Sequence, residues 1–157
     1  MTTQAFNLYT ANGYAGDLVD SGPRVIQTGI LTSATAGFGL GMSRDASVER
    51  GVSLGGSANV FAISQREYNH EASVRPSTGD DTLYRQTESV SLIRQGYLYV
   101  KLSGAVAVAA GEFLHVDTST GLFSKSSVAG NVVATTNVVA DEAAIAGEVF
   151  KIRIDIK

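Results

Sequence analysis

The C-terminal half of the chain alternates apolar and polar residues over short segments that are separated by glycine and small polar residues. The clearest case is the C-terminus, where the apolar side chains of Phe150, Ile152, Ile154 and Ile156 alternate with charged ones. A period of two is that of a β-strand with one buried face. Because a buried face needs a partner sheet, this pattern confines the chain to folds in which sheets pack on each other.

Further candidate strands lie upstream, at residues 97–102, 106–108 and 113–116, and each is bounded by glycine or a polar turn. In the first of them, the two tyrosines project to one face, and Leu98 and Val100 project to the other. A strand that is apolar on both faces indicates association, with one of the two sets buried against another subunit. The residue pattern therefore predicts an all-β protein, and this double-sided strand is its best physical indication of association.

The composition favours one folded domain that is rich in turns. The chain has 157 residues, of which 44% are hydrophobic and 17% charged, with 17 glycines and only 2 prolines. This length supports one domain with a core, or a core with an extended arm. We expect an antiparallel β-barrel or a jelly-roll-like sandwich with an extended N-terminal arm and little helix.

Charge and cysteine content exclude several classes of protein. The net charge is −3, and the lysines and arginines form no cluster in the sequence, which argues against nucleic-acid binding. With no cysteine, the chain has neither disulfides nor thiolate metal sites, which suits assembly in a reducing cytosol. No signal peptide opens the sequence, and no apolar run approaches the roughly 18 residues that span a bilayer. We therefore expect neither export nor a membrane partner.

The chain divides into an N-terminal segment, residues 1–29, and a single antiparallel β domain, residues 30–157. The first segment has turn-forming residues between short apolar groups, and it is either an extended arm or edge segment or an ordinary first strand and loop. Within the domain we expect a short helix over 43–50, a buried strand over 60–63 and a loop over 75–81.

After that loop, the pattern predicts two successive strands, 83–94 and 96–102, with a corner at Gln95 and Gly96. A hairpin is expected next, in which 117–121 joins 113–116 to residues 122 and 123. The tripeptide Ala-Gly-Glu precedes an alternating segment twice, at 110–112 and at 146–148. We interpret these two copies as equivalent strand starts within one barrel or sandwich.

Two glycine-rich motifs resemble known functional loops. Residues 51–55, Gly-Val-Ser-Leu-Gly, match the nucleophile elbow that would present Ser53 in a triad with a carboxylate and His115. An elbow joins a strand to a long helix, whereas here another strand is expected next, so we interpret the motif as a glycine-rich loop. Residues 37–41 resemble a dinucleotide-binding loop, but the glycine spacing is wrong and no βαβ unit surrounds them.

Metal sites are equally poorly supported by the sequence. His70 and His115, together with Glu71 or Asp117, supply too few ligands to define a site. The acidic residues Asp80, Asp81 and Glu88 lack the spacing of a calcium loop and are expected to be solvated. Most of the six tyrosines and six phenylalanines are expected in the core. We predict no catalytic, cofactor-binding or metal-binding residue.

The order of motifs resembles the structural cement, or head decoration, proteins of tailed bacteriophages. The resemblance is carried by a Gly-x-hydrophobic-x-Asp-Ser segment at 16–21, a hydrophobic strand with a polar continuation at 60–66, and a Tyr-x-x-x-Glu-Ser-Val-Ser pattern that opens 84–97. It continues through the first Ala-Gly-Glu strand and its Asp-to-Gly turn at 110–121, and ends on the second at 146–148. Together these segments span most of the chain.

This resemblance implies a non-enzymatic virion protein on the outer surface of the phage head, made in the host cytoplasm. Its implied partners are the major capsid protein, whose neighbouring subunits it would bridge, and further copies of itself, with a trimer favoured and a dimer as the alternative. A competing interpretation is a phage fibre or host-surface module that binds carbohydrate through clustered aromatic residues. A small hydrolase built on Ser53 is a third class.

Overall fold

The computed structural model describes residues 13–19, 22–67, 83–125 and 131–155, and within these ranges the protein is built from β-strands without a helix. The strands are β1 (Val25–Leu31), β2 (Thr35–Ala36), β3 (Gly41–Asp45), β4 (Gly51–Leu54), β5 (Ala62–Ser64), β6 (Tyr84–Arg85), β7 (Ser89–Ser103), β8 (Phe113–Asp117), β9 (Phe123–Ser124), β10 (Val132–Ala140) and β11 (Val149–Asp155). The all-β prediction is confirmed.

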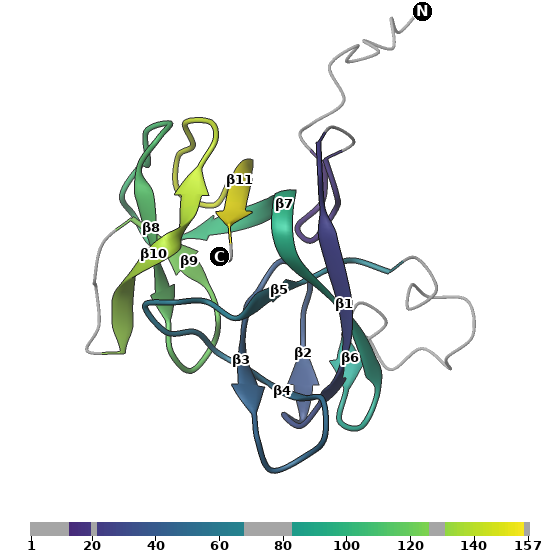
Figure 1. Cartoon of the computed structure of the whole chain (residues 1–157). Coiled ribbons are helices and arrows are strands. Elements are labelled where there is room, and N and C mark those ends of the chain that lie inside the picture. The colour runs from purple at the N-terminus through teal and green to yellow at the C-terminus, as the bar shows by residue number, and fades with distance from the viewer. Residues whose placement is uncertain (1–12, 20–21, 68–82, 126–130, 156–157) are drawn as a thin grey trace, which may run out of the picture.

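The main sheet closes on itself twice and forms two barrels that share β7. In the first, β1, β4, β3, β5 and β7 are successive neighbours, and β1 pairs with β7 to close the ring. In the second, β7, β11, β10, β8 and β9 are neighbours, and β9 pairs with β7. Figure 1 shows β7 running from one barrel to the other. Of the two architectures expected, the chain forms the closed barrel.

The shared strand β7 is a single strand of 15 residues, so the predicted corner at Gln95 and Gly96 is wrong. Its first part pairs with β1, up to Val25 opposite Gln95, and its second part pairs with β11, from Gln95 to Lys101. Gly96 has a φ of +132° at this change of partner. Glycine adopts positive φ without steric cost. The chain therefore passes between barrels without interrupting the strand.

Alternation along β5 and β7 gives each barrel its own core. Ala62 and Leu92 belong to the apolar cluster of the first barrel, whereas their neighbours Ile63 and Ile93 belong to the larger cluster of the second. Buried Asn137 of β10 reinforces this junction, because its side chain bonds both the amide and the carbonyl of Val60, at 3.1 and 2.8 Å. The two barrels thus pack directly against each other.

Two pairings in the sheet are parallel, β1 with β4 and β7 with β9, whereas the remaining pairs are antiparallel. We expected an antiparallel domain throughout. The parallel β7–β9 pair closes the second barrel, and the parallel β1–β4 pair involves the strand that closes the first. Ring closure is a long-range property, and local hairpin signals in the sequence carry no information about it.

The short helix expected over 43–50 is wrong, because this stretch holds most of β3 and a following turn. Strand β3 pairs with β4 from Met42 opposite Leu54 to Asp45 opposite Gly51, and it also pairs with β5. A segment this short forms no stable helix alone. Pairing with two strands and burial of Met42 outweigh its weak local preference.

The expected hairpin between β8 and β9 is confirmed. Its turn is held by Asp117, whose Oδ1 accepts hydrogen bonds from the amides of Ser119 and Thr120 at 2.7 and 2.9 Å and from the Ser119 hydroxyl. These hydrogen bonds, the Ser119 hydroxyl first, lower the pKa of the Asp117 carboxyl. The polar sequence from 117 to 121 is therefore a turn stabilised by its own carboxylate.

The two Ala-Gly-Glu segments form equivalent strand starts, as the sequence indicated. Glu112 accepts from the amide of Ala109 at 2.8 Å, and Glu148 accepts from the amide of Ile145 at 2.9 Å. The glycines between them, at positions 111 and 147, have φ of +85° and +83°. Val108 and Ala144, which lie just before the two turns, pair with each other through reciprocal hydrogen bonds. The second barrel therefore contains a local repeat.

Candidate functional site

Ser53 lies in β4, directly opposite Ser43 of β3, in extended backbone. The Gly-Val-Ser-Leu-Gly pattern is thus part of a strand and the residues that flank it, rather than a sharp turn into a helix. His115 lies in β8, paired with Ala134 and Ser124 in the second barrel. Nothing in the pairing of these strands brings Ser53 and His115 together.

Glycines of both glycine-rich motifs meet the hairpin turn of the second barrel. Gly41 donates to the carbonyl of Gly121 at 2.8 Å, and Gly55 donates to the carbonyl of Gly41 at 3.1 Å. A Cβ added at Gly121 would lie 2.3 Å from the Gly41 oxygen, and one at Gly55 would lie 2.3 Å from the Thr118 oxygen. These glycines are needed because three stretches of backbone touch where the barrels join.

The candidate metal ligands do not form a site in the described part of the chain. His70, Glu71, Asp80 and Asp81 lie outside the described residues. Glu88 accepts a hydrogen bond from the amide of Arg85 at 2.8 Å, so its carboxylate closes a turn. Across the described ranges, no group of three or more His, Cys, Asp or Glu side chains is arranged to hold a metal ion.

Residues 13–19 lie along an open edge of β7 and bind it through its backbone. Gly16 donates to the carbonyl of Tyr99 at 2.7 Å, Tyr99 donates to that of Asp17 at 2.9 Å, and Val19 donates to that of Tyr97 at 3.2 Å. This edge lies between the part of β7 that pairs with the first barrel and the part that pairs with β9. The segment therefore seals the junction of the two barrels.

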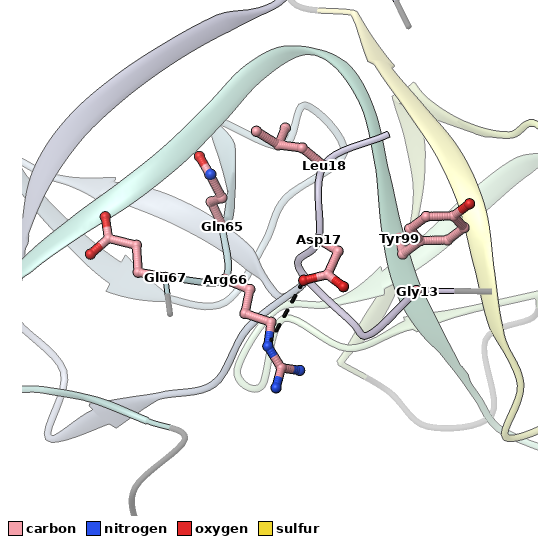
Figure 2. A pocket seen from close by; sticks show the side chains of 7 residues that line it. All are labelled: Gly13, Asp17, Leu18, Gln65, Arg66, Glu67 and Tyr99. Carbon is pink, nitrogen blue, oxygen red and sulfur yellow. Dashed lines mark ion pairs between the residues drawn. The ribbon is translucent and has the colours of Figure 1, made fainter. Parts of the chain in front are cut away.

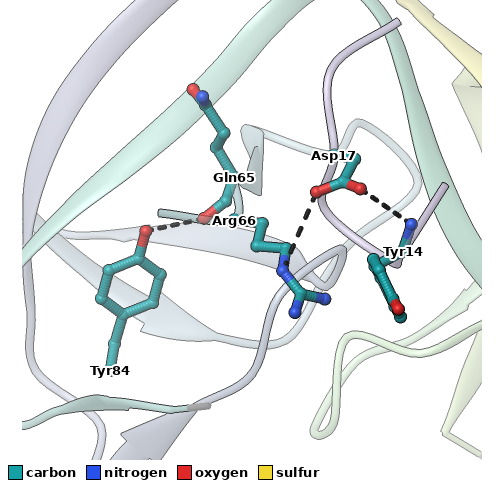
Figure 3. Close-up of polar contacts among 5 residues, drawn as sticks. All are labelled: Tyr14, Asp17, Gln65, Arg66 and Tyr84. Atoms are coloured by element: carbon teal, nitrogen blue, oxygen red, sulfur yellow. Dashed lines mark hydrogen bonds and ion pairs between the residues drawn. The ribbon is translucent and has the colours of Figure 1, made fainter. Parts of the chain in front are cut away.

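Arg66 fixes this segment from the opposite side. Its amide donates to the carbonyl of Gly16 at 2.8 Å, and its Nε lies 3.8 Å from Asp17 Oδ1 (Figure 3). The guanidinium lies over the ring of Tyr14, 4.3 Å from the centroid. Tyr14 itself is 67% exposed. Arg66 therefore joins the N-terminal segment to the polypeptide that leaves β5, through a backbone hydrogen bond, an ion pair and a cation–π contact.

A surface pocket of about 630 Å³ opens beside this contact (Figure 2). Its lining combines the N-terminal segment, the polypeptide after β5, and β7: Gly13, Asp17, Leu18, Gln65, Arg66, Glu67 and Tyr99. Tyr97 and Tyr99 are half-buried, whereas Leu98 and Val100 are fully buried in the core. The apolar set of β7 is thus internal, and Tyr99 of the other set lines the pocket beside residues 13–19.

The paired turns of the second barrel carry exposed apolar side chains. Ile145 is 61% exposed, Phe113 53% and Val106 45%. The acidic side chains here are engaged within the chain. Glu112 pairs with Lys125, which together with the Ala109 amide lowers the pKa of the Glu112 carboxyl. This end of the molecule therefore presents an apolar surface with compensated charges, which the sequence did not single out.

No helix of the described residues is long and apolar enough to cross a membrane.

The fold and family of the chain follow from comparison with known proteins. No curated protein matches it. Among solved structures, a chain from the capsid of Myoviridae phage XM1 has a similar fold, with a TM-score of 0.71 and 16% identity, over 97% of this chain and 98% of that chain. The model of the family described as structural cement protein (E217 gp24/Pam3 gp6) matches residues 1–155. The chain therefore belongs to the structural cement protein family of phages.

Proposed function

We propose that this protein binds the outer surface of the phage head and bridges neighbouring major capsid subunits, which stabilises the shell against the pressure of packaged DNA. The observation that carries the proposal is the family match over residues 1–155. That family is structural and implies association with the capsid shell. The fold shared with a chain of a phage capsid supports the same role.

The physical basis of the proposal is multivalency. A protein that touches several shell subunits gains effective concentration from each contact, so modest individual contacts add up to strong retention. Binding that favours the assembled shell also stabilises it by mass action. Two barrels that share one strand suit this role, because contacts on the two are held at a fixed separation. Oligomerisation, with a trimer favoured, multiplies the contacts further.

The N-terminal arm is part of this proposal, now limited to the residues before Gly13. Residues 13–19 bind β7 and Arg66, and residues 25–29 lie in β1. Only a segment that begins earlier can reach a neighbouring subunit without unsealing the barrel junction. The larger apolar residues of that segment after Met1 are Phe6, Leu8 and Tyr9.

Deleting residues 1–12 therefore tests the arm separately from the body. We expect the deletion to leave the free energy of unfolding unchanged and to reduce retention on purified heads during sedimentation. A longer deletion through Val19 serves as a control, because it should also destabilise the free protein by removing the backbone hydrogen bonds to β7. If the protein that lacks residues 1–12 occupies heads as fully as the wild type, the arm does not contribute to binding.

The function itself is tested by cosedimentation with heads purified from a phage that lacks this protein. We expect saturable binding to expanded heads, compared in parallel with unexpanded procapsids. A panel of glycans is titrated in the same buffer, because a host-surface carbohydrate module would bind glycans in isolation. Binding to a glycan without binding to heads would replace the proposed function with the carbohydrate-binding one.

A further inference from the structure

The inward face of the first barrel changes from apolar to cationic at one end. On β3, buried Met42 is followed two residues later by Arg44, and on β7, buried Leu92 is followed two residues later by Arg94. Side chains two residues apart in a strand share a face. Arg50 lies in the turn just before β4, and it lines the same hollow as Arg44, Val52 and Leu92. Three arginines therefore approach one end of the barrel, two from strands and one from a turn.

Phe61 lies close to two of these arginines. The guanidinium of Arg94 is 4.7 Å from the centroid of its ring, and that of Arg44 is 5.8 Å from it. Arg44, Arg50 and Phe61 also line one small hollow, together with Val52 and Leu92. Arg44, Arg50, Arg94 and Phe61 thus form a group, which we call the arginine cluster.

Within the described part of the chain, the neighbouring side chains do not neutralise the positive charge of the arginine cluster. Among the described residues, no carboxylate forms an ion pair with any of its three arginines. Arg50 donates to the carbonyl of Thr28 at 3.2 Å, and the Nε of Arg94 is buried without a hydrogen-bond partner. The nearby carboxylate of Asp45 is already engaged by Ser47, which lowers its pKa.

An arrangement of this kind is costly unless an anion completes it. Arg44 and Arg50 are exposed, so water screens much of their repulsion, whereas the buried Nε of Arg94 has no acceptor and therefore costs free energy. Arg50 also has a φ of +59°, which is strained for a residue that has a Cβ. Planar guanidinium groups match carboxylates in paired hydrogen bonds, and a ring beneath them holds their orientation.

We propose that the arginine cluster is a docking site for side-chain carboxylates of an acidic segment on the capsid shell. This inference rests on the proposed function and names the chemistry of one of its contacts. A carboxylate complements the guanidinium groups in charge and geometry. A nucleic acid is disfavoured as the partner. Binding along a phosphate backbone requires a wider basic surface than three arginines, and the chain has a net charge of −3.

The first experiment compares two double variants that remove the same charge at different places. Arg44→Gln with Arg94→Gln removes the cluster, whereas Arg85→Gln with Arg153→Gln removes two exposed arginines elsewhere. We expect the cluster variant to bind purified heads at least about tenfold more weakly, with the control variant close to the wild type. Equal binding by both variants would overturn the docking site.

This comparison separates the inference from the proposed function. If the wild-type protein itself does not bind heads, the proposed function and the docking site are both wrong. If the wild type binds and the cluster variant binds equally well, the function stands and the site is wrong. A third variant, Arg44→Lys with Arg94→Lys, keeps the positive charge but lacks the planar guanidinium group, and it should have an intermediate affinity.

The second experiment uses the wild type and does not depend on how a variant folds. A poly-glutamate peptide is titrated into the protein while the side-chain Nε–H signals of the arginines are followed by NMR. We expect the Arg94 and Arg44 signals to shift, with no shift at Arg85, and the effect to weaken as salt is added. Shifts of equal size at all arginines, or shifts with single-stranded DNA but not with the peptide, would contradict the assignment.

Discussion

At the scale of single residues, Tyr84 shows how the first barrel combines burial with a polar anchor. Its ring is fully buried and packs edge-to-face on Phe38, with centroids 5.3 Å apart. Its hydroxyl donates to the carbonyl of Gln65 at 2.6 Å (Figure 3). That carbonyl immediately precedes Arg66, which binds the N-terminal segment. One side chain thus links the core to the polypeptide that closes the barrel junction.

Replacing Tyr84 with Phe should destabilise the protein by about 1–2 kcal/mol, because the carbonyl of Gln65 loses a buried donor while the ring is kept. Chemical denaturation measures this difference. Tyr14→Phe is the matched control, since Tyr14 is 67% exposed and should tolerate the change. Equal stability of the two variants would show that the Tyr84 hydroxyl contributes nothing.

The same hydroxyl predicts a pH dependence. Burial, assisted by the negative charge of Glu67, raises the pKa of the Tyr84 phenol above its ordinary value of 10.0. Above that pH the unfolded chain loses the proton and the folded chain keeps it, so the free energy of unfolding falls as pH rises. The wild type should lose up to about 1.4 kcal/mol per pH unit more than Tyr84→Phe. Parallel curves for the two proteins would contradict this assignment.

At the scale of elements, the sequence predicts the strands whose residues alternate. It does not predict the features that depend on pairing between strands far apart in the chain. Strands β8, β9 and β11 are local patterns with clear turns, so the hairpin and the two Ala-Gly-Glu starts were predictable. The sequence wrongly predicts a helix over 43–50, where part of β3 lies, because local residues do not reveal the pairing of β3 with β4 and β5. The continuity of β7 through Gly96 was missed for the same reason.

The arginine cluster was missed because its members are scattered along the chain, at positions 44, 50 and 94. A run of basic residues is visible in a sequence, whereas the convergence of β3, β7 and the turn before β4 depends on how the barrel closes. A usable signal did exist for two of the three arginines. Arg44 and Arg94 each stand in a strand two positions after a buried apolar residue, where alternation predicts another apolar side chain.

The backbone contact between the barrels can be tested at one glycine. Gly121→Ala combines a φ of +69° with a Cβ placed 2.3 Å from the carbonyl oxygen of Gly41. Gly111→Ala is the matched control, because its φ is +85° but nothing lies within 4 Å of the added Cβ. The control should cost about 1–2 kcal/mol from backbone strain alone.

Gly121→Ala should be less stable than this control by about 1–3 kcal/mol, since backbone atoms must move apart. Thermal or denaturant unfolding of both variants measures the difference. If the two substitutions cost the same, close packing of the backbones of Gly41 and Gly121 does not contribute to stability.

At the scale of the whole molecule, two small barrels on one continuous strand make a body whose contact surfaces keep a fixed relation. The exposed apolar side chains of Val106, Phe113 and Ile145 lie on the paired turns of the second barrel, and the arginine cluster lies at an end of the first. A protein that joins neighbouring subunits benefits from such an arrangement, because rigid spacing limits the entropy lost on binding. The proposed bridging function depends on this fixed spacing of contact surfaces.

The most direct test of that function measures how well heads hold together. DNA-filled heads that lack the protein are heated with and without purified protein added back, and DNA release is followed by the fluorescence of a dye. The account predicts that the added protein raises the temperature of release in proportion to its occupancy, and that Arg44→Gln with Arg94→Gln does so less at equal concentration. Release at the same temperature on fully occupied and on bare heads would contradict it.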